Sequence, residues 1–337
     1  MNATVYSTDT DETRLEAIMA AQTALRDKQT IVIPTDTVYG IAADAFSPEA
    51  VEKLLAAKGR SRTMPPPVLI FDEAVLPGLA DEVSGDATAL AREFWPGALT
   101  LILYSQPSLN WDLGQTQGTV ALRVPDDPLA IELLRQSGPL AVSSANKTGL
   151  KAATTAQEAA EQLGQDVELI LDGGPRPLGE QDPQEEVLPS TIVDCTSKRL
   201  VLVRQGAISL EQLRRVVPSI ISKEELEAEN RAASARQLEQ EPLDQEDLED
   251  SGDQEQSDSA SSGQAGLRAS APAPGSLNSR LLASAPAATG VDQIRSKQAY
   301  RMEQQTQPDY RTKPLSVSQA QALVFAGQDK KEPLEEQ

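Results

Sequence analysis

Two patterns of apolar and polar residues alternate from about residue 11 to residue 216. Short apolar runs rich in β-branched residues predict strands, and they lie at residues 30–34, 68–71, 99–104, 119–124, 140–144, 167–172, 190–194 and 200–204. Longer segments with apolar residues at helical spacing predict helices, and they lie at residues 11–27, 48–57, 86–94, 128–136, 155–163 and 209–216. Strands interleaved with helices indicate the α/β class, with helices on both faces of a sheet.

One pair of predicted strands breaks this alternation. The runs at residues 99–104 and 119–124 follow each other with no helical segment between them, which is typical of antiparallel neighbours. We therefore expect a twisted, open sheet of mixed parallel and antiparallel strands with flanking helices.

The pattern ends after Pro218. Residues 221–266 are rich in Glu, Gln, Asp and Ser and contain no aromatic residue, and residues 269–290 are rich in Ala, Pro and Ser. Neither stretch can bury enough apolar surface to offset an ordering cost of about 1–2 kcal/mol per residue. The sequence therefore predicts a globular domain over residues 1–218 and a largely disordered acidic tail over residues 219–337.

Two short helices are predicted within that tail. Residues 221–240 have the composition of a charged helix, and residues 315–325 carry apolar side chains at near-helical spacing. The second cluster has two interpretations, a chance grouping in a tail or a short helix that docks on a partner.

The net charge and the counts of histidine and cysteine exclude several classes of function. The chain has 51 acidic and 30 basic residues, a net charge of -21, and no histidine. A protein with this much negative charge repels nucleic acid, and we therefore expect weak or no direct nucleic-acid binding. The lack of histidine excludes Ser-His and Cys-His catalytic pairs and imidazole metal ligands. A lone cysteine, Cys195, excludes an internal disulfide and a cysteine-based zinc site, so we expect no protein-bound metal.

The N-terminus lacks the basic and apolar segments of a signal peptide, and no stretch approaches 18 consecutive apolar residues. From these features we expect a cytoplasmic protein with no membrane association.

Polar and cationic residues gather next to the predicted strands. Residues 34–40, Pro-Thr-Asp-Thr-Val-Tyr-Gly, follow the first strand, where open α/β sheets place ligands; a local turn held by side-chain hydrogen bonds is the alternative. Lys58, Arg60 and Arg62 end a helix before a run of prolines. They fit a phosphate-binding cluster, and the alternative is that they complement the negative end of the helix dipole.

Three further groups complete the set. Thr119 and Arg123 share one face of a predicted strand, so Arg123 needs an anionic partner, either a structural carboxylate or a substrate. Ser144, Ala145 and Asn146 close another strand with small polar groups of the kind that recognise nucleotides. Ser190 begins a strand and Arg204 ends one.

These motifs and their order along the chain closely resemble those of the YrdC-like family of threonylcarbamoyl-AMP synthases. The resemblance covers about residues 13–218 and rests on PTDTVYGIAADA, Lys58-Gly59-Arg60, GTVALRVP, Ser144-Ala145-Asn146, Asp172-Gly173-Gly174, PSTIVD and VLVRQGAI. It implies a twisted open sheet with a deep, positively charged cavity. It also implies that L-threonine, bicarbonate and ATP condense to threonylcarbamoyl-AMP with release of pyrophosphate, with Mg²⁺ bound through the ATP phosphates. A tRNA threonylcarbamoyl transferase complex then uses the product to modify adenosine 37 of tRNAs.

The resemblance also implies roles for residues of this chain. The residues implied to contact threonine are Thr35, Arg123, Val142 through its backbone, and Ser190. Those implied to contact ATP and the bicarbonate-derived group are Lys58, Arg60, Thr119, Ser144, Asn146 and Arg204. Among them, Lys58 and Arg60 are implied to act in catalysis by neutralising charge.

The chain departs from the family pattern at three places. Leu69 lies near a position where many members carry histidine, Pro189 replaces a frequent glutamate, and Ala152-Ala153 replaces a polar turn. Two other functions stay open: an RNA-binding relative without adenylation activity, and a carbamoyl-transfer relative. The second normally carries cysteine-rich domains that this chain lacks.

Overall fold

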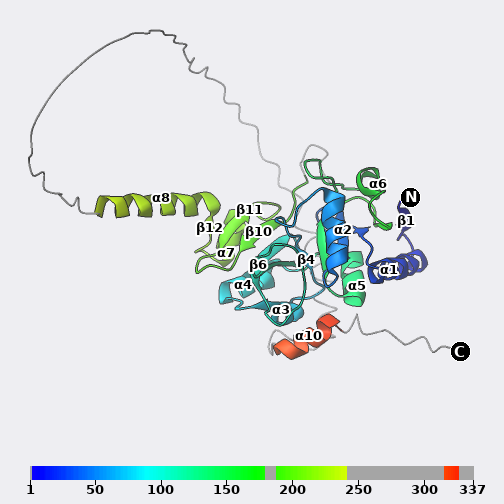
Figure 1. The fold of residues 1–337 in the computed structure, drawn as a ribbon, viewed down its shortest axis with the longest axis horizontal. Helices are drawn as coiled ribbons and strands as arrows, with labels where there is room; N and C mark the ends of the chain where they lie inside the picture. The colour runs from blue at the N-terminus through cyan, green and yellow to red at the C-terminus, as the bar shows by residue number, and fades with distance from the viewer. Residues whose placement is uncertain (1, 179–186, 241–314, 326–337) are drawn as a thin grey trace, which may run out of the picture.

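The computed structural model describes residues 2–178, 187–240 and 315–325 (Figure 1). Its strands are β1 (Thr4–Ser7), β2 (Ile31–Ile33), β3 (Gly40–Asp44), β4 (Val68–Leu69), β5 (Ala80–Asp81), β6 (Leu99–Ser105), β7 (Thr119–Arg123), β8 (Leu140–Ser144), β9 (Leu169–Asp172), β10 (Thr191–Asp194), β11 (Val201–Arg204) and β12 (Ile221–Ser222). Its helices are α1 (Asp11–Arg26), α2 (Pro48–Lys58), the 3-10 helix η1 (Glu73–Val75), α3 (Leu76–Leu79), α4 (Gly85–Phe94), α5 (Pro128–Ser137), α6 (Ala156–Leu163), α7 (Leu210–Val216), α8 (Lys223–Gln240) and α10 (Val317–Phe325).

The described strands form one mixed sheet. Their order is β1-β9-β2-β3-β8-β4-β7-β6-β10-β11-β12, and β5 pairs with β6 beside this path. β6 and β7 are antiparallel, as predicted from the missing helix between them, whereas β10 runs parallel to β6 and antiparallel to β11. The predicted mixed α/β sheet with flanking helices is confirmed.

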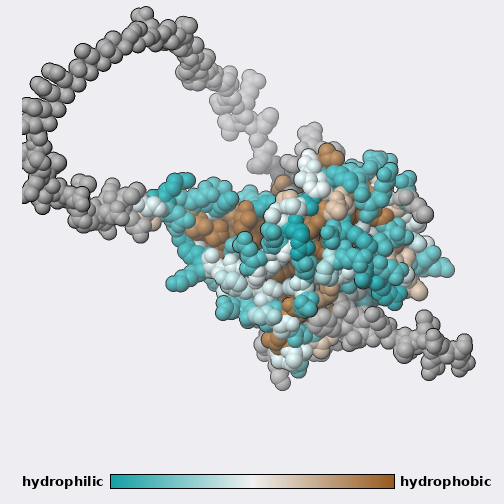
Figure 2. All heavy atoms as spheres, in the orientation of Figure 1, coloured by the Kyte–Doolittle hydropathy of each residue, from teal (hydrophilic) through white to brown (hydrophobic). Residues whose placement is uncertain are grey.

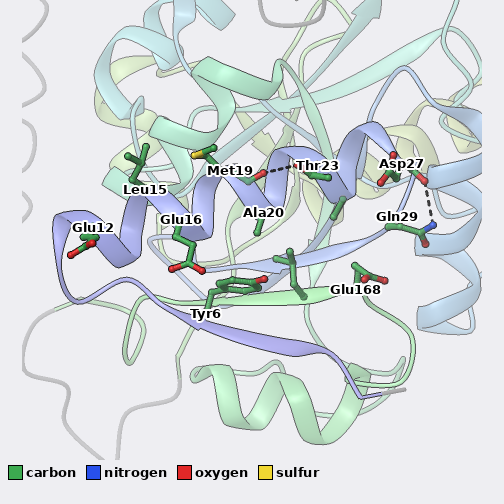
Figure 3. A pocket seen from close by; sticks show the side chains of 12 residues that line it. Tyr6, Glu12, Leu15, Glu16, Met19, Ala20, Thr23, Asp27, Gln29 and Glu168 are labelled. Carbon is green, nitrogen blue, oxygen red and sulfur yellow. Dashed lines mark hydrogen bonds between the residues drawn. The ribbon is translucent and has the colours of Figure 1, made fainter. Parts of the chain in front are cut away.

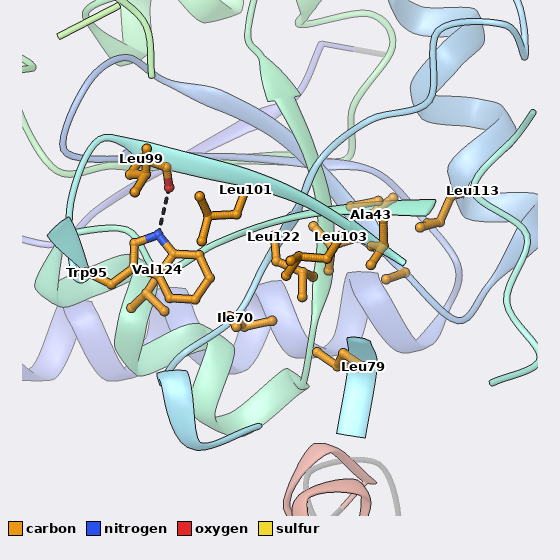
Figure 4. Close-up of a cluster of buried hydrophobic side chains, with 14 of the residues drawn as sticks. Ala43, Ile70, Leu79, Trp95, Leu99, Leu101, Leu103, Leu113, Leu122 and Val124 are labelled. Carbon is orange, nitrogen blue, oxygen red and sulfur yellow. Dashed lines mark hydrogen bonds between the residues drawn. The ribbon is translucent and has the colours of Figure 1, made fainter. Parts of the chain in front are cut away.

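Apolar side chains pack on both faces of the sheet, because successive residues of a strand point to opposite sides. In β2, Ile31 and Ile33 pack with α1 and α5, while Val32 joins a larger cluster on the other face. Figure 4 shows part of that larger cluster, in which the Trp95 indole N–H donates to the Leu99 carbonyl at 2.7 Å. The sheet is thus fixed from both sides.

Every predicted strand and helix of the domain has a counterpart within a few residues. Six elements were not predicted: β1, β3, η1, α3, β5 and β12. Of these, β3 matters most, because it lies between β2 and β8 and carries the backbone next to the first candidate motif.

Described structure continues past residue 218. β12 pairs with β11, and α8 projects from this edge of the sheet (Figure 1). The predicted apolar cluster near residues 315–325 is the helix α10, which packs against α3 of its own chain. The disorder predicted for residues 241–314 lies outside the described residues. Figure 2 shows hydrophilic residues over most of the visible face, in keeping with the acidic composition.

None of the helices in the described ranges is both long and apolar enough to cross a lipid bilayer.

Candidate functional site

A cavity of about 310 Å³ lies over the middle of the sheet. Its lining includes eight of the residues singled out from the sequence, which come from three strands and three loops: Thr35, Arg60, Thr119, Arg123, Val142, Ser144, Ser190 and Arg204. Segments that are far apart along the chain therefore meet in one place. Lys58 and Asn146 are not part of the lining.

The floor of the cavity is the face of the sheet. Thr119, Ala121 and Arg123 alternate along β7, and Thr100 and Ile102 alternate along β6 beside them. The predicted common face of Thr119 and Arg123 is confirmed. The expectation that the polar groups gather at strand ends is incomplete, because the open face between those ends supplies the floor.

Thr35 forms a tight hydrogen-bonded turn directly after β2. Its hydroxyl donates to the Val38 carbonyl at 2.6 Å and accepts the Thr37 N–H at 3.2 Å. The turn is thus held by local side-chain bonds, which was the alternative interpretation of this motif, and it lines the cavity as well. It leads into Gly40, where an added Cβ would lie 2.5 Å from Val142 Cγ1, so β3 and β8 approach closely here.

Arg123 has a structural carboxylate partner, Asp36. Its Nη2 donates to Asp36 Oδ1 at 2.5 Å, its Nε donates to the Gly97 carbonyl at 2.9 Å, and both terminal nitrogens lie 3.3 Å from Thr37 Oγ1. The charge of this buried guanidinium is therefore balanced within the protein. The structural interpretation of this arginine is therefore confirmed. One N–H of Nη1 has no acceptor among the described residues, and contact with a substrate stays a prediction.

Arg60 and Arg204 differ from Arg123, because no carboxylate in the described parts of the chain forms an ion pair with either. Arg60 Nη1 donates to Ser143 Oγ at 2.9 Å, and its buried Nε has no hydrogen-bond partner among the described residues. Arg204 donates to the Ser190 carbonyl at 2.7 Å. Burial lowers the pKa of both groups, and the pKa of Arg204 is lowered further by Arg123 and Arg60. The cavity thus holds uncompensated positive charge, which an anion would neutralise.

Lys58 lies one layer behind the cavity wall. Its ammonium donates to the carbonyls of Ser144 and Asn146, the latter at 2.7 Å, and its side chain is 1% exposed. Burial, with Arg60 and Lys147 nearby, lowers the pKa of Lys58 to about 7. It holds the Ser144–Asn146 turn in place, and Asn146 helps by donating from Nδ2 to the Leu150 carbonyl at 2.8 Å.

Gly59 separates Lys58 from Arg60. It ends α2 with φ 64°, a left-handed conformation that glycine adopts without strain. Beyond it, Arg60 enters the cavity, while Arg62 lies at the surface in an ion pair with Asp112. The three cations that the sequence grouped together therefore occupy three different environments.

Ser190 is positioned by residues on both sides. Its hydroxyl accepts a hydrogen bond from Thr100 Oγ1 at 3.0 Å and lies 3.2 Å from Arg204 Nη2. Leu69 and Pro189, two of the three departures from the family pattern, also line the cavity. Val142 lines it too, with its backbone N–H donating to the Pro67 carbonyl at 2.8 Å.

Sequence reasoning missed the roles of Asp36 and Thr100. Asp36 lies inside the motif at residues 34–40 that was singled out, so its carboxylate was an available signal for the arginine's partner. Thr100 lies between two leucines in a largely apolar strand and is 1% exposed. Such a buried hydroxyl needs a partner, but the strand sequence does not say which.

A further buried network supports the loops around the cavity. Arg176, which follows the Asp-Gly-Gly motif, pairs with Asp127 at 2.8 Å. The Tyr39 hydroxyl donates to the Gly174 carbonyl at 2.7 Å. Burial and nearby Asp172 raise the pKa of Tyr39, so this hydroxyl stays neutral. The network ties the Thr35 turn to the loop after β9.

A second hollow, of about 760 Å³, lies between α1 and the strands β1 and β9 (Figure 3). Besides the exposed side chains of Leu15 and Met19, its lining carries four carboxylates, those of Glu12, Glu16, Asp27 and Glu168. Carboxylates repel a polyphosphate, and none of the predicted site residues lies there.

Two other kinds of chemistry find little support in the described residues. Cys195 is buried, and burial raises the pKa of its thiol, so it is not a reactive thiolate. Across the described ranges, no group of three or more Cys, Asp or Glu side chains is placed to hold a metal ion.

The chain is similar to known proteins over most of the domain. The Sua5_yciO_yrdC family model, described as "Telomere recombination", matches residues 23–206. A Mycobacterium tuberculosis relative is 46% identical over 206 residues, which are 61% of this chain and 91% of the relative. Threonylcarbamoyl-AMP synthase of Bacillus subtilis is 39% identical over 215 residues, which are 63% of this chain and 60% of that protein.

Solved structures agree with this similarity. Pyrococcus abyssi Sua5 complexed with L-threonine is 32% identical with a TM-score of 0.59, covering 66% of this chain and 62% of that one. Escherichia coli YciO is 25% identical with a TM-score of 0.54, covering 63% of this chain and 100% of that one. The chain thus spans less than two thirds of the Bacillus and Pyrococcus proteins.

Proposed function

This chain belongs to the Sua5/YciO/YrdC family, and from that premise we propose that its cavity makes threonylcarbamoyl-AMP from L-threonine, bicarbonate and ATP. The amine of threonine and bicarbonate form a carbamate with loss of water. A carbamate oxygen then attacks the α-phosphorus of ATP, and pyrophosphate leaves. The product supplies the threonylcarbamoyl group for adenosine 37 of tRNAs.

The observation that carries this proposal is the uncompensated charge of Arg60 and Arg204. In a chain with a net charge of -21, these two cations face one cavity, and no carboxylate of the described residues pairs with them. A cation at a cavity wall that has no countercharge in the protein is available to pair with an anionic ligand. A triphosphate supplies the missing negative charge and suits the fork-shaped guanidinium groups.

On the amino-acid side, we propose that threonine contacts Thr35, Arg123, the Val142 backbone and Ser190. The remaining N–H of Arg123 is suited to the threonine carboxylate, because Asp36 and Thr37 already fix the guanidinium plane. The binding of L-threonine by Pyrococcus abyssi Sua5 supports this assignment at the level of the family.

On the nucleotide side, we propose that ATP and the bicarbonate-derived group contact Arg60, Thr119, Ser144 and Arg204. Lys58 and Asn146 contribute from behind, by holding the turn that carries Ser144. Attack on the α-phosphorus needs mainly positioning and charge neutralisation. Arg60 and Arg204 provide the charge, and we assign no protein side chain as the general base.

Mg²⁺ is proposed to enter bound to the ATP phosphates. Asp36, a carboxylate beside the cavity, is already engaged by Arg123. Phosphate oxygens are therefore the suitable ligands for the ion, which would neutralise part of the charge that develops on pyrophosphate.

The remaining assignments concern the whole protein. We propose that the synthase domain spans residues 1–218 and that it delivers its product to a tRNA threonylcarbamoyl transferase complex. The cytoplasmic location inferred from the sequence stays a prediction.

The test compares two arginines that lie two residues apart. Arg60→Ala removes a cation from the cavity and is expected to lower threonine-dependent pyrophosphate release by about 10²-fold, because the cation stabilises charge that develops during transfer. Arg62→Ala is the matched control, since Arg62 lies at the surface with Asp112, and we expect its rate to stay within about twofold of the parent.

The outcomes separate the alternatives. Equal rates for Arg60→Ala and the parent would remove this cavity from the reaction. If the parent bound RNA in a salt-sensitive way but released no pyrophosphate with threonine, the RNA-binding alternative would replace the synthase.

A further inference from the structure

The helix α10 covers an apolar face formed by η1 and α3. Within α10, Ala320 is 0% exposed and Val324 is 1% exposed, whereas Val317 at its start is 43% exposed. In Figure 4 this helix lies beside the end of the core that contains Leu79. A nine-residue helix on its own is marginal in water, so its buried stripe against α3 supplies its stability.

The contact is close because α3 carries a glycine at the crossing point. A Cβ added to Gly78 would lie 2.8 Å from the Gln321 nitrogen, 2.9 Å from the Ala320 carbonyl carbon and 3.2 Å from Ala320 Cβ. These three nearest atoms all belong to α10, so the docked helix sets the closest limit on the space next to Gly78. Two small residues, Gly78 and Ala320, thus let the two backbones approach.

α10 also has its own start signal. The Gln319 N–H donates to Ser316 Oγ at 3.3 Å, and the Ser316 N–H donates to Gln319 Oε1 at 3.0 Å. This reciprocal capping box fixes where the helix begins. Together with the apolar spacing, it makes α10 a defined recognition element, although it lies outside the residues 23–206 that the family model matches.

The docked helix contacts the loop that forms one wall of the cavity. Gln321 Nε2 of α10 donates to Ser108 Oγ at 2.7 Å. That loop, residues 106–118, starts on α3, where the Gln106 N–H donates to the Leu79 carbonyl at 2.9 Å. Further along, Leu113 and Thr116 line the cavity.

The far part of the same loop is tied to the segment that carries Arg60. The Gln115 N–H donates to the Arg62 carbonyl at 2.7 Å. The Trp111 ring stacks on Phe46 with centroids 5.4 Å apart. A continuous set of contacts therefore runs from α10 through the loop to the cavity.

We propose that the η1–α3 face is a docking site whose occupant is the chain's own C-terminal helix α10, and that the docked helix braces the 106–118 loop at the wall of the cavity. Because the occupant is part of the same chain, a small contact suffices to keep it docked. Release of α10 uncovers the face and loosens the loop, so the tail regulates the cavity through its wall.

The test uses the full chain carrying Gly78→Ala and follows hydrogen–deuterium exchange by mass spectrometry. The three atoms nearest to the added methyl group belong to α10, so we expect exchange over residues 317–325 to become at least about tenfold faster, because overpacking of this kind disrupts a close contact. We expect exchange over residues 106–118 to rise as well. Gly85→Ala is the matched control, since nothing lies within 4 Å of a Cβ there, and it should change neither segment.

A second pair of variants addresses the same contact from the other side. Val324→Asp places a charge on the buried stripe of α10 and should give the same exchange pattern as Gly78→Ala, whereas Ser318→Asp on the exposed side should not.

Parent-like protection of residues 317–325 in both disruptive variants would overturn the docking site. Faster exchange in α10 with an unchanged 106–118 loop would overturn the bracing role. Neither readout depends on catalysis, so failure here is distinct from failure of the proposed synthase activity.

Discussion

This fold places two sets of arginines in opposite charge environments. Arg176 and Asp127 form an ion pair in which the side chains are 4% and 0% exposed, and the Gly173 carbonyl accepts a further bond from Arg176. At the cavity, Arg60 is half-buried and Arg204 is more exposed, and the described residues offer them hydroxyl and carbonyl oxygens and no carboxylate.

The difference separates structural charge from functional charge. A buried cation whose countercharge is in the same chain contributes to a fixed conformation, and removing it leaves its partner unpaired. A cation with no countercharge gains little for the folded state and gains most when an anion binds. Charge compensation therefore tells the two roles apart. Variants of each class test that distinction.

The largest effect is expected at the compensated pair. Arg176→Met leaves the Asp127 carboxylate buried without its cation, so the free energy of unfolding should fall by about 3–5 kcal/mol. Urea unfolding followed by tryptophan fluorescence measures this, since Trp95 and Trp111 both lie in the domain. Arg14→Met, in the half-buried pair with Glu132, should cost less than about 1 kcal/mol. Equal losses in the two variants would contradict the distinction.

A smaller effect, on activity and not on stability, is expected at Arg204. Arg204→Ala should lower threonine-dependent pyrophosphate release by about 10²-fold. Its free energy of unfolding should stay within about 1 kcal/mol of the parent, because the lost bond to the Ser190 carbonyl is offset by relief of repulsion from Arg123 and Arg60. Arg199→Ala, at an exposed pair with Glu229, is the control for both measurements. A variant that is active but unstable would place Arg204 with the structural charges.

The smallest effect concerns Lys58, whose charge is met by carbonyls alone. Its pKa is lowered to about 7 in the folded chain, whereas an unfolded lysine titrates near about 10.4. Between these values the unfolded chain binds more protons, so stability rises with pH. The cost in folding free energy of burying the charged Lys58 ammonium is therefore greatest below pH 7, and it disappears as the pH rises toward 10.

Lys58→Met removes this titration. The free energy of unfolding of the parent, relative to the variant, should therefore increase from pH 7 to pH 9 by at most about 1.4 kcal/mol per pH unit. Urea unfolding at several pH values measures the slope, with Lys53→Met at a half-exposed position as the control. Parallel curves for parent and Lys58→Met would show that Lys58 keeps an ordinary pKa.

Much of the sheet could be predicted because its strands are apolar and β-branched. β3 was missed because Gly-Ile-Ala-Ala-Asp is dominated by small residues with low strand preference. Its place is set by pairing with β2 and β8, and Gly40 is needed there for the close approach to Val142. The η1–α3 turn was missed for a similar reason, since Pro77 and Gly78 indicate a turn until α10 packs on them.

The candidate site was predictable as a set of motifs but not as a geometry. The resemblance to the family predicted that Arg60 and Arg204 lie at one cavity. It did not reveal that Lys58 turns toward backbone carbonyls, since this depends on where the Ser144–Asn146 turn lies in space. Nor did it identify Asp36 as the partner of Arg123, because residues 36 and 123 meet only through the order of the strands.

The left-handed residue Gly59 determines how two neighbouring cations divide their tasks. At this position the chain changes direction, so the ammonium of Lys58 supports the scaffold while the guanidinium of Arg60 reaches the open space. A side chain at position 59 would favour a different backbone angle and would swing both cations together. The positive φ angle of Gly59 therefore determines that one cation is buried in the protein interior and the next one lines the cavity.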